Sequence, residues 1–127
     1  MSEPIVGTFA IKQDIPTQFV DDILCSAFEG GINYWCSSAY PVDMQFPDGA
    51  KYASDCLSRG RDIILEEFDE YDDSVKLHLL TLKKFINGLS LYFENFGGSL
   101  IELHDNHDAG HADCIVQYSI FGEVVYA

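Results

Sequence analysis

Apolar residues recur at helical spacing in two stretches of the first hundred residues. Thr17 is placed to cap the first helix, whose apolar positions repeat every three or four residues until Gly30 and Gly31 end it. Thr81 is placed to cap the second helix in the same way. This second helix contains Gly88, which costs about 1 kcal/mol relative to alanine in a helix interior. We therefore expect packing against the rest of the protein to hold the second helix in place.

A third helix is predicted from Ala109 to Phe121, where apolar residues again share one face. Asp108 falls at its N-cap, where a carboxylate accepts hydrogen bonds from otherwise unpaired backbone amides. His111 occupies the third helical position, from which a side chain reaches back to the cap residue. Gly122 supplies the stop. Capping therefore explains the acidic start of this helix without any ligand.

Three further stretches have the β-branched, aromatic or alternating character of strands. They are INYWCSSAY (32–40), RDIILEEF (61–68) and SVKLHLL (74–80). The last two flank the acidic segment DEYDD (69–73) and predict a hairpin. A short helix is expected between the first and second strands, capped by Asp48 and ended by Gly60. The predicted fold is α+β, with a small three-stranded antiparallel sheet covered by three to four helices.

Length and composition indicate one folded domain spanning residues 1–127. Of these residues, 47% are hydrophobic, which is enough for a core without help from disulfides or metals. The chain has 21 acidic residues against 7 basic ones, a net charge of −14. Such a field repels nucleic acid and anionic membranes. We therefore expect neither a membrane nor nucleic acid as a direct partner.

The start of the chain lacks the basic and apolar pattern of a secretion signal, and no stretch reaches the roughly 18 apolar residues needed to span a bilayer. The cysteines include no CxxC pair, which argues against a zinc ribbon or a thioredoxin-like motif. We expect reduced, mostly buried thiols at Cys25, Cys36, Cys56 and Cys114. These features favour a cytoplasmic protein.

A three-stranded sheet leaves two edges without a partner strand. IVGTFAIK (5–12) is suited to be either an edge strand or an ordered arm. FGEVVYA (121–127) is suited to pair with a sheet edge or with another subunit. We therefore expect a homo-oligomer.

The segment HDNHDAGHADC (104–114) raises the question of a metal site, because it carries three histidines. His107 and His111 would have to lie on one continuous helix with His104 or an aspartate as a third ligand, but Gly110 and the cap at Asp108 interrupt that geometry. The HExxH glutamate is missing, as are GxSxG, P-loop and Rossmann motifs. We expect no metal, no cofactor and no enzymatic activity.

Four of the seven basic residues fall in two pairs, one of which begins the second predicted helix, where backbone amides already favour an anion. Aromatic residues gather in the same middle region of the chain, and rings beside cations suit a nucleotide-like ligand. The candidate ligand-binding residues are Tyr34, Trp35, Tyr52, Arg59, Arg61, Lys83 and Lys84. Alternatively, Arg61, Lys83 and Lys84 pair with the acidic run 62–73, and Arg59 complements the negative end of the short helix that precedes Gly60. The rings then belong to the core or to an interface.

Four segments in the same order resemble small uncharacterised proteins encoded by bacteriophages and other mobile elements of Gram-positive gut bacteria. They are EGGINYWC (29–36), YASDCLSRG (52–60), LTLKKFINGL (80–89) and ADCIVQYSIFGEVVYA (112–127). The resemblance implies a protein acting in the cytoplasm of an infected host. It implies no activity and no catalytic or binding residues.

A phage origin favours a non-enzymatic inhibitor of host defence, and two physical routes are open. The protein binds and sequesters a small, anionic, nucleotide-derived signal through its aromatic and cationic residues, which is the function we expect. Alternatively, its acidic surface mimics nucleic acid or directly inhibits a basic defence protein, such as a nuclease, in the manner of an anti-CRISPR or anti-restriction protein.

Overall fold

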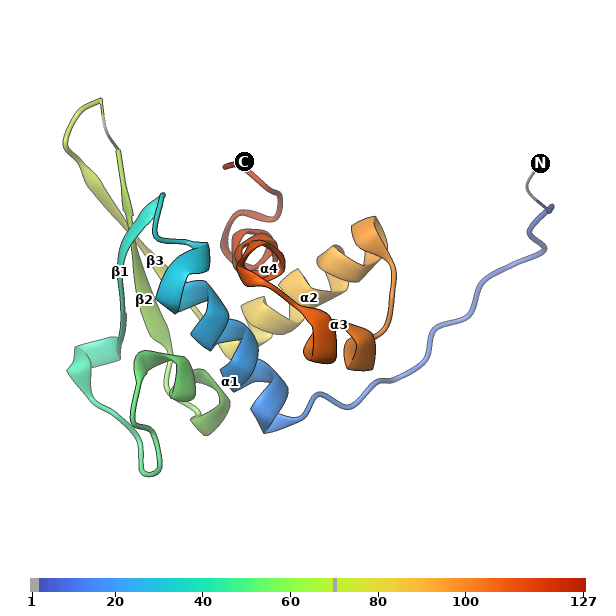
Figure 1. The fold of residues 1–127 in the computed structure, drawn as a ribbon, viewed down its shortest axis with the longest axis horizontal. Coiled ribbons are helices and arrows are strands. Elements are labelled where there is room, and N and C mark those ends of the chain that lie inside the picture. Colours follow the sequence, from blue (N-terminus) through green and yellow to red (C-terminus); the bar gives the residue numbers. More distant parts are fainter. Residues whose placement is uncertain (1–2, 70) are drawn as a thin grey trace.

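The computed structural model describes residues 3–69 and 71–127, in which an open three-stranded sheet lies beside a group of helices (Figure 1). The strands are antiparallel and lie in the order β1, β2, β3; their bounds are Cys36–Pro41, Ile63–Phe68 and Val75–Leu80. Ile63 pairs with Leu80, and Phe68 pairs with Val75, so the predicted hairpin is confirmed. Glu70, in the predicted turn of this hairpin, lies outside the described residues. The predicted α+β class with a three-stranded antiparallel sheet is confirmed.

The described residues form four α-helices: α1 (Thr17–Ser26), α2 (Leu82–Phe96), α3 (Leu100–Asn106) and α4 (Ala109–Phe121). In Figure 1, α4 occupies the middle of the molecule, with the sheet and α1 on one side and α2 and α3 on the other. Its buried residues Ile115 and Val116 join Phe19 of α1, Leu65 of β2 and Phe85 of α2 in one core. Within the described residues, no helix combines the length and apolar character that crossing a bilayer requires.

The predicted helix ends are confirmed where local hydrogen bonds define them. Asp108 Oδ1 accepts from the His111 backbone N–H at 2.9 Å, and the Asp108 N–H donates to His111 Nδ1 at 3.1 Å. This is a capping box in which histidine takes the place of glutamate. Thr81 Oγ1 accepts from the backbone N–H of Lys84 at 3.1 Å, and Gly122 ends α4 with φ 76°.

Other predicted boundaries are wrong, because a neighbouring residue takes the cap position or a local backbone hydrogen bond forms a turn. Thr17 is the first residue of α1 rather than its cap, since Pro16 holds the N-cap position with an extended backbone. The helix continues through a π-helical turn, Ala27–Gly31, as far as the expected glycine. Residues 32–35 form a turn and not a strand, because the Trp35 N–H donates to the Ile32 carbonyl at 3.0 Å.

The short helix expected after Asp48 is also different. Only two 3₁₀ turns form, Ala53–Asp55 and Leu57–Arg59, and Gly60 ends the second with φ 89° as expected. Helix α3 was not anticipated. Ser99 caps α3 by accepting from the Glu102 N–H at 3.2 Å.

The four cysteines are free thiols, as predicted. Cys36 and Cys56 are buried, whereas Cys25 and Cys114 are half-buried. Burial raises the pKa of the Cys36 thiol above its ordinary value, which keeps it protonated and unreactive at neutral pH.

Candidate functional site

The structure does not bring the seven predicted ligand-binding residues together. Tyr34 and Trp35 line one pocket near the C-terminal tail. Tyr52 is exposed and lies against a neighbouring lysine, with the Lys51 ammonium 5.5 Å from its ring centre. Lys83 is exposed in the first turn of α2. The expected convergence of cations and rings is therefore not found in the described part of the chain.

Both arginines are engaged within the fold. Arg59 forms a salt bridge with Asp21 of α1 at 3.0 Å, and the Asp55 carbonyl accepts a second hydrogen bond from it at 2.8 Å. Arg61 Nε donates to the Val42 carbonyl at 3.0 Å. The alternative expectation for Arg61, pairing with the acidic run 62–73, misses its partners Val42 and Asp43. The bond from Arg59 to the Asp55 carbonyl agrees with the alternative that Arg59 complements the end of a short helix.

Lys84, the last of the four predicted cations, contacts the edge strand of the sheet. Lys84 Nζ donates to the Leu79 carbonyl of β3 at 2.7 Å. A lysine that occupies an edge carbonyl is a recognised way of limiting strand addition at that point. Lys84 is thus partly committed to the fold.

Tyr34 and Trp35 belong to what we call the aromatic pocket, a cavity of about 320 Å³. Its lining consists of Tyr34, Trp35, Phe68, Asp69, Tyr71 and Tyr126. The Trp35 ring is buried and stacks on Tyr126 with centroids 5.5 Å apart and planes 3° from parallel. Tyr34 meets Tyr126 edge-on at 6.5 Å. Among the lining residues that the structure describes, Asp69 carries the only charged side chain, a carboxylate.

A buried carboxylate on α4 holds the floor of the aromatic pocket. Asp113 accepts from Trp35 Nε1 at 2.8 Å, from the Tyr34 hydroxyl at 2.6 Å and from Gln117 Nε2 at 2.8 Å. The same amide of Gln117 accepts, through Oε1, from the N–H groups of Val125 and Tyr126 at 2.8 Å each. These hydrogen bonds hold the C-terminal tail, residues 122–127, against α4. The expectation that residues 121–127 pair with a sheet edge is therefore wrong.

The tail is also fastened to the sheet. The Tyr126 hydroxyl donates to Glu67 of β2, whose other oxygen lies 2.8 Å from His78 Nε2 of β3. Burial alone raises the pKa of the Glu67 carboxyl, but hydrogen bonds from Tyr126 and His78 together hold that pKa below its ordinary value. The hydrogen bond to Glu67 raises the pKa of Tyr126 to about 12, and burial with the bond to Asp113 raises that of Tyr34 to about 12.

The raised pKa values of Tyr126 and Tyr34 predict that the protein loses stability at alkaline pH. Because the folded pKa of Tyr126 lies above the ordinary value of 10.0, its stabilising contribution is complete below about pH 10 and disappears as the pH rises towards 12. We expect Tyr126→Phe to lose less free energy of unfolding between these limits than the wild type, as measured by denaturant titration at each pH. The fully exposed Tyr71, replaced by Phe, is the control. If Tyr126→Phe lost as much free energy of unfolding as the wild type, the loss would not come from the Tyr126 phenol.

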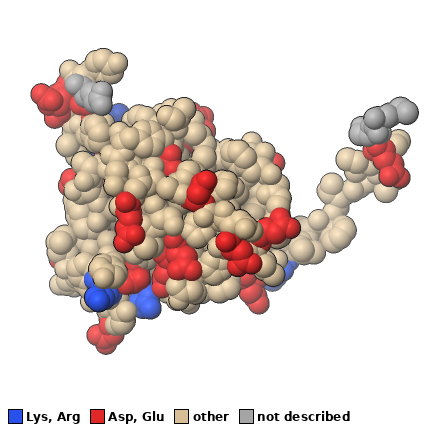
Figure 2. Space-filling view, in the orientation of Figure 1, with Lys and Arg blue, Asp and Glu red and all other residues tan. Residues whose placement is uncertain are grey.

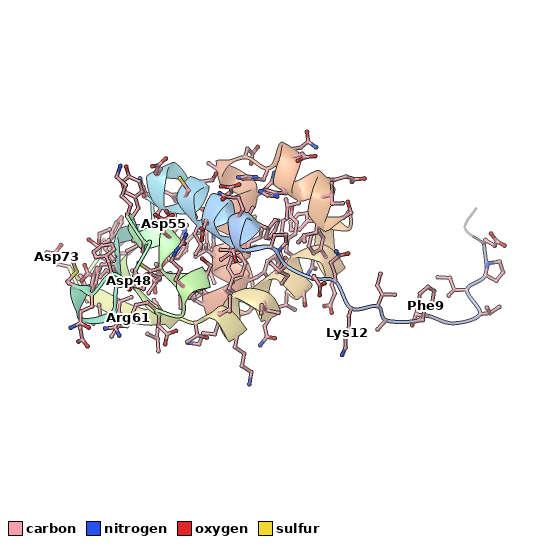
Figure 3. The ribbon with its side chains drawn as sticks, turned by 90° about the horizontal axis from the view of Figure 1, so that it is seen from below. Phe9, Lys12, Asp48, Asp55, Arg61 and Asp73 are labelled. Atoms are coloured by element: carbon pink, nitrogen blue, oxygen red, sulfur yellow. The ribbon has the colours of Figure 1, made fainter. Side chains whose placement is uncertain are left out.

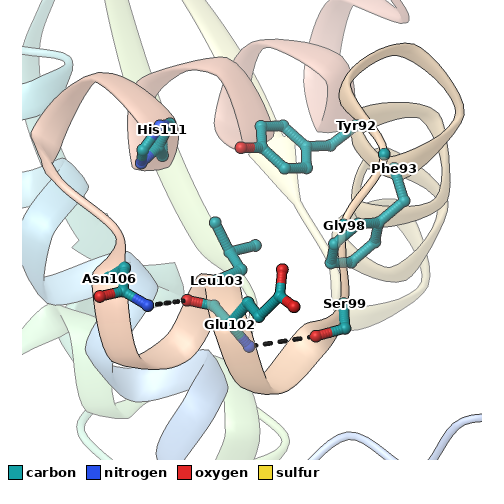
Figure 4. A pocket seen from close by; sticks show the side chains of 9 residues that line it. Tyr92, Phe93, Gly98, Ser99, Glu102, Leu103, Asn106 and His111 are labelled. Atoms are coloured by element: carbon teal, nitrogen blue, oxygen red, sulfur yellow. Dashed lines mark hydrogen bonds between the residues drawn. The ribbon is translucent and has the colours of Figure 1, made fainter.

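A second cavity, the interhelical pocket, of about 330 Å³, lies where α2 ends, α3 passes and α4 begins (Figure 4). The Tyr92 hydroxyl points across it towards His111, whose ring centre is 6.4 Å from that of Tyr92. Glu102 lies at its lower side, on the turn of α3 that Ser99 caps (Figure 4). Burial raises the pKa of Tyr92, so it stays neutral. The arrangement offers hydrogen-bonding groups, but the described lining brings no nucleophile and base together.

The sequence reasoning missed this pocket. The signal for it was the glycine pair Gly97 and Gly98 followed by Ser99, which ends one helix and caps the next. Both glycines have positive φ, 70° and 90°, and the resulting sharp turn opens the space between α2 and α3.

Two of the three histidines in the segment 104–114, His104 and His107, link it to α1, whereas His111 caps its own helix. His104 Nε2 lies 2.7 Å from Asp22 of α1, and this hydrogen bond lowers the pKa of the Asp22 carboxyl. His107 Nε2 lies 2.8 Å from the Ser26 hydroxyl, also on α1. Among the residues that the structure describes, no three His, Cys, Asp or Glu side chains are grouped as metal ligands would be.

Comparison with protein-family models, with curated proteins and with solved structures finds no match for this chain. The function therefore has to be inferred from the geometry of the chain itself.

Proposed function

We propose that the protein is a non-enzymatic inhibitor that binds a basic protein surface and so keeps nucleic acid or another anionic partner away from it. The observation that carries this proposal is a strongly acidic exterior beside a pocket of aromatic rings and one carboxylate. The resemblance to bacteriophage proteins makes a host defence protein the expected target, and the cytoplasm of the infected cell the expected place of action.

The acidic exterior is not neutralised by neighbouring cations. Carboxylate side chains are spread across the face seen in Figure 2, and the few basic side chains in view lie near its margins. Arg59 is already paired with Asp21, and Arg61 and Lys84 donate to backbone carbonyls. A net charge of −14 therefore acts on the surroundings as an unopposed negative field, which speeds association with basic surfaces at low salt.

The aromatic pocket supplies a short-range anchor for a basic side chain. Arginine and lysine cations are attracted to the faces of tryptophan and tyrosine rings, and Asp69 adds a carboxylate to the same lining. Tyr71 is fully exposed at the hairpin, and Tyr34 is half exposed, so both are accessible to a partner. Aromatic residues of this kind often dominate the energy of an interface.

Sequestration of a nucleotide-derived signal, the function expected from the sequence, stays a prediction. The aromatic rings suit a base, but the described lining of their pocket carries Asp69 and no arginine or lysine. A phosphate placed there would meet a carboxylate without a compensating cation, which is unfavourable. The geometry therefore supports a cationic partner better than an anionic ligand.

The proposal is tested with a hexa-arginine peptide as the probe and Trp35, the single tryptophan of the chain, as the reporter. We expect saturable changes in Trp35 fluorescence with hexa-arginine, weaker as salt rises from roughly 50 to 200 mM, and none with hexa-glutamate. Tyr71→Ala should weaken binding roughly 3- to 30-fold, the range of a cation–π contact. Glu94→Gln, an exposed carboxylate on α2, is the matched control and should change binding little.

The same samples distinguish the two functions. A rise in melting temperature with cyclic or ADP-ribose-derived nucleotides, together with an absence of response to hexa-arginine, would overturn the proposal in favour of sequestration. A ligand at 100 times its Kd adds about 2.7 kcal/mol to the free energy of unfolding, which such a melting experiment detects.

A further inference from the structure

The N-terminal arm, residues 3–15, is an extended segment with apolar side chains in solvent. Ile5, Phe9 and Ile11 expose between 74 and 89% of their surface. Figure 3 shows Phe9 and Lys12 on an arm that projects away from the folded body. Apolar side chains gathered in this way on a soluble chain mark a surface that binds a partner.

The arm has the pattern of a β-strand. Ile5, Phe9 and Ile11 fall on alternate positions, as the side chains of one strand face do. The described part of the arm nevertheless forms no strand. Its strand-forming character is therefore unused within a single chain.

Strand β3 offers a matching open edge. The sheet order places β3 at one side, and Val75, Leu77 and Leu79 are exposed there, from 42 to 62%. The Leu79 carbonyl accepts from Lys84 instead of from β2, and backbone groups alternate in direction along a strand. The amides and carbonyls of Val75 and Leu77 therefore face outwards as well, free to pair with another strand.

Charge also favours this pairing over other contacts between two copies. Residues 4–13 contain no carboxylate and one lysine, and β3 contains no carboxylate, one lysine and one histidine. In a chain of net charge −14, most surfaces of two copies repel each other. These two segments meet without bringing acidic side chains together.

The arm is directed away from its own β3. Ile11 and Ile15 line a groove with Ile86 and Phe93 of α2, so the root of the arm follows α2 away from the sheet. In Figure 1 the arm leaves the body on the side opposite to the sheet. Its strand-like residues are therefore directed into solvent, where a second copy can reach them.

We propose that the arm of one copy adds as a fourth strand to the β3 edge of a second copy, and that the exchange is reciprocal around a two-fold axis. The strand-like part, residues 5–11, is about as long as the six-residue β3. Each exchange covers the exposed apolar faces of both segments and satisfies the outward backbone groups of Val75 and Leu77, because the Leu79 carbonyl is already occupied by Lys84. The assembly stands independently of the proposed inhibitor function.

Charge substitutions on exposed residues test the exchange without disturbing the fold. We expect wild-type dimers by light scattering, and Phe9→Asp and Leu77→Lys should each weaken dimerisation at least about tenfold. An equimolar mixture of the two variants should dimerise again, because the mixed dimer keeps one unaltered pair and places Asp opposite Lys in the other. Ile101→Lys, an equally exposed change on α3, is the control and should leave the dimer intact.

Two results would overturn the exchange. One is a wild-type protein that stays monomeric at every concentration tested. The other is a dimer that Leu77→Lys disrupts and Phe9→Asp leaves unchanged, since this pattern means that β3 strands contact each other directly without the arm.

Discussion

Replacing Asp113 with alanine is expected to destabilise the protein by about 3 kcal/mol or more. The substitution leaves the Trp35 indole N–H, the Tyr34 hydroxyl and the Gln117 amide without their shared acceptor. The Trp35 N–H then has no acceptor among the described residues, whereas the Tyr34 hydroxyl and the Gln117 amide keep the Tyr126 carbonyl as an acceptor, at 3.3 and 3.1 Å. A buried polar group left without a partner costs roughly 1–3 kcal/mol, and each hydrogen bond lost to a charged group costs roughly 1.5–3 kcal/mol. Denaturant unfolding followed by Trp35 fluorescence measures the loss.

The Asp113 substitution should also change the tail. Gln117, which holds the backbone of Val125 and Tyr126, loses the carboxylate that orients it. The Tyr126 ring is then free to leave the face of Trp35, so fluorescence quenching by iodide should increase even in the folded protein. Asp105→Ala removes an exposed carboxylate from α3 and is the control. Equal stability of the two variants would show that the Asp113 network does not support the fold.

Replacing Gly88 with alanine is expected to destabilise the protein by roughly 1–3 kcal/mol, although alanine is the better helix former. Helix α2 crosses α4 at this glycine, and a Cβ there would lie 2.6 Å from the Ser119 backbone nitrogen. Backbone atoms cannot move aside as a flexible side chain does, so the helices must separate. Thermal unfolding by circular dichroism measures the effect.

The neighbouring substitution Asn87→Ala isolates helix propensity from packing, because Asn87 is exposed on the same helix. We expect it to leave stability unchanged or to raise it slightly. If Gly88→Ala were as stable as Asn87→Ala, the close approach of α2 and α4 would be wrong.

Together, the aromatic pocket and the tail explain why the C-terminal residues are more than an extension of α4. Trp35, Tyr126 and Phe121 pack against each other, and Tyr126 reaches Glu67 on β2. The pocket proposed to receive a basic side chain is therefore built on the same contacts that stabilise the fold. Variants meant to test binding are best placed at its exposed members, such as Tyr71.

The sequence by itself determined the features that depend on neighbours along the chain. Asp108 and His111 are three residues apart, and the hairpin strands are joined by a short acidic turn, so local spacing was enough to predict both. The α+β class followed from the same periodicities. The position of Gly88 indicated that α2 depends on packing, although not which helix it meets.

Only the tertiary structure decided which distant side chains share a site. Trp35 and Asp113 are 78 residues apart, and Arg59 and Asp21 are 38 apart. A sequence pattern shows that an arginine or a ring is present, but its partner depends on how helices and strands pack. For this reason Tyr34 and Trp35 line a pocket. Arg59, Arg61 and Lys84 instead bind the protein's own carboxylate and carbonyl groups.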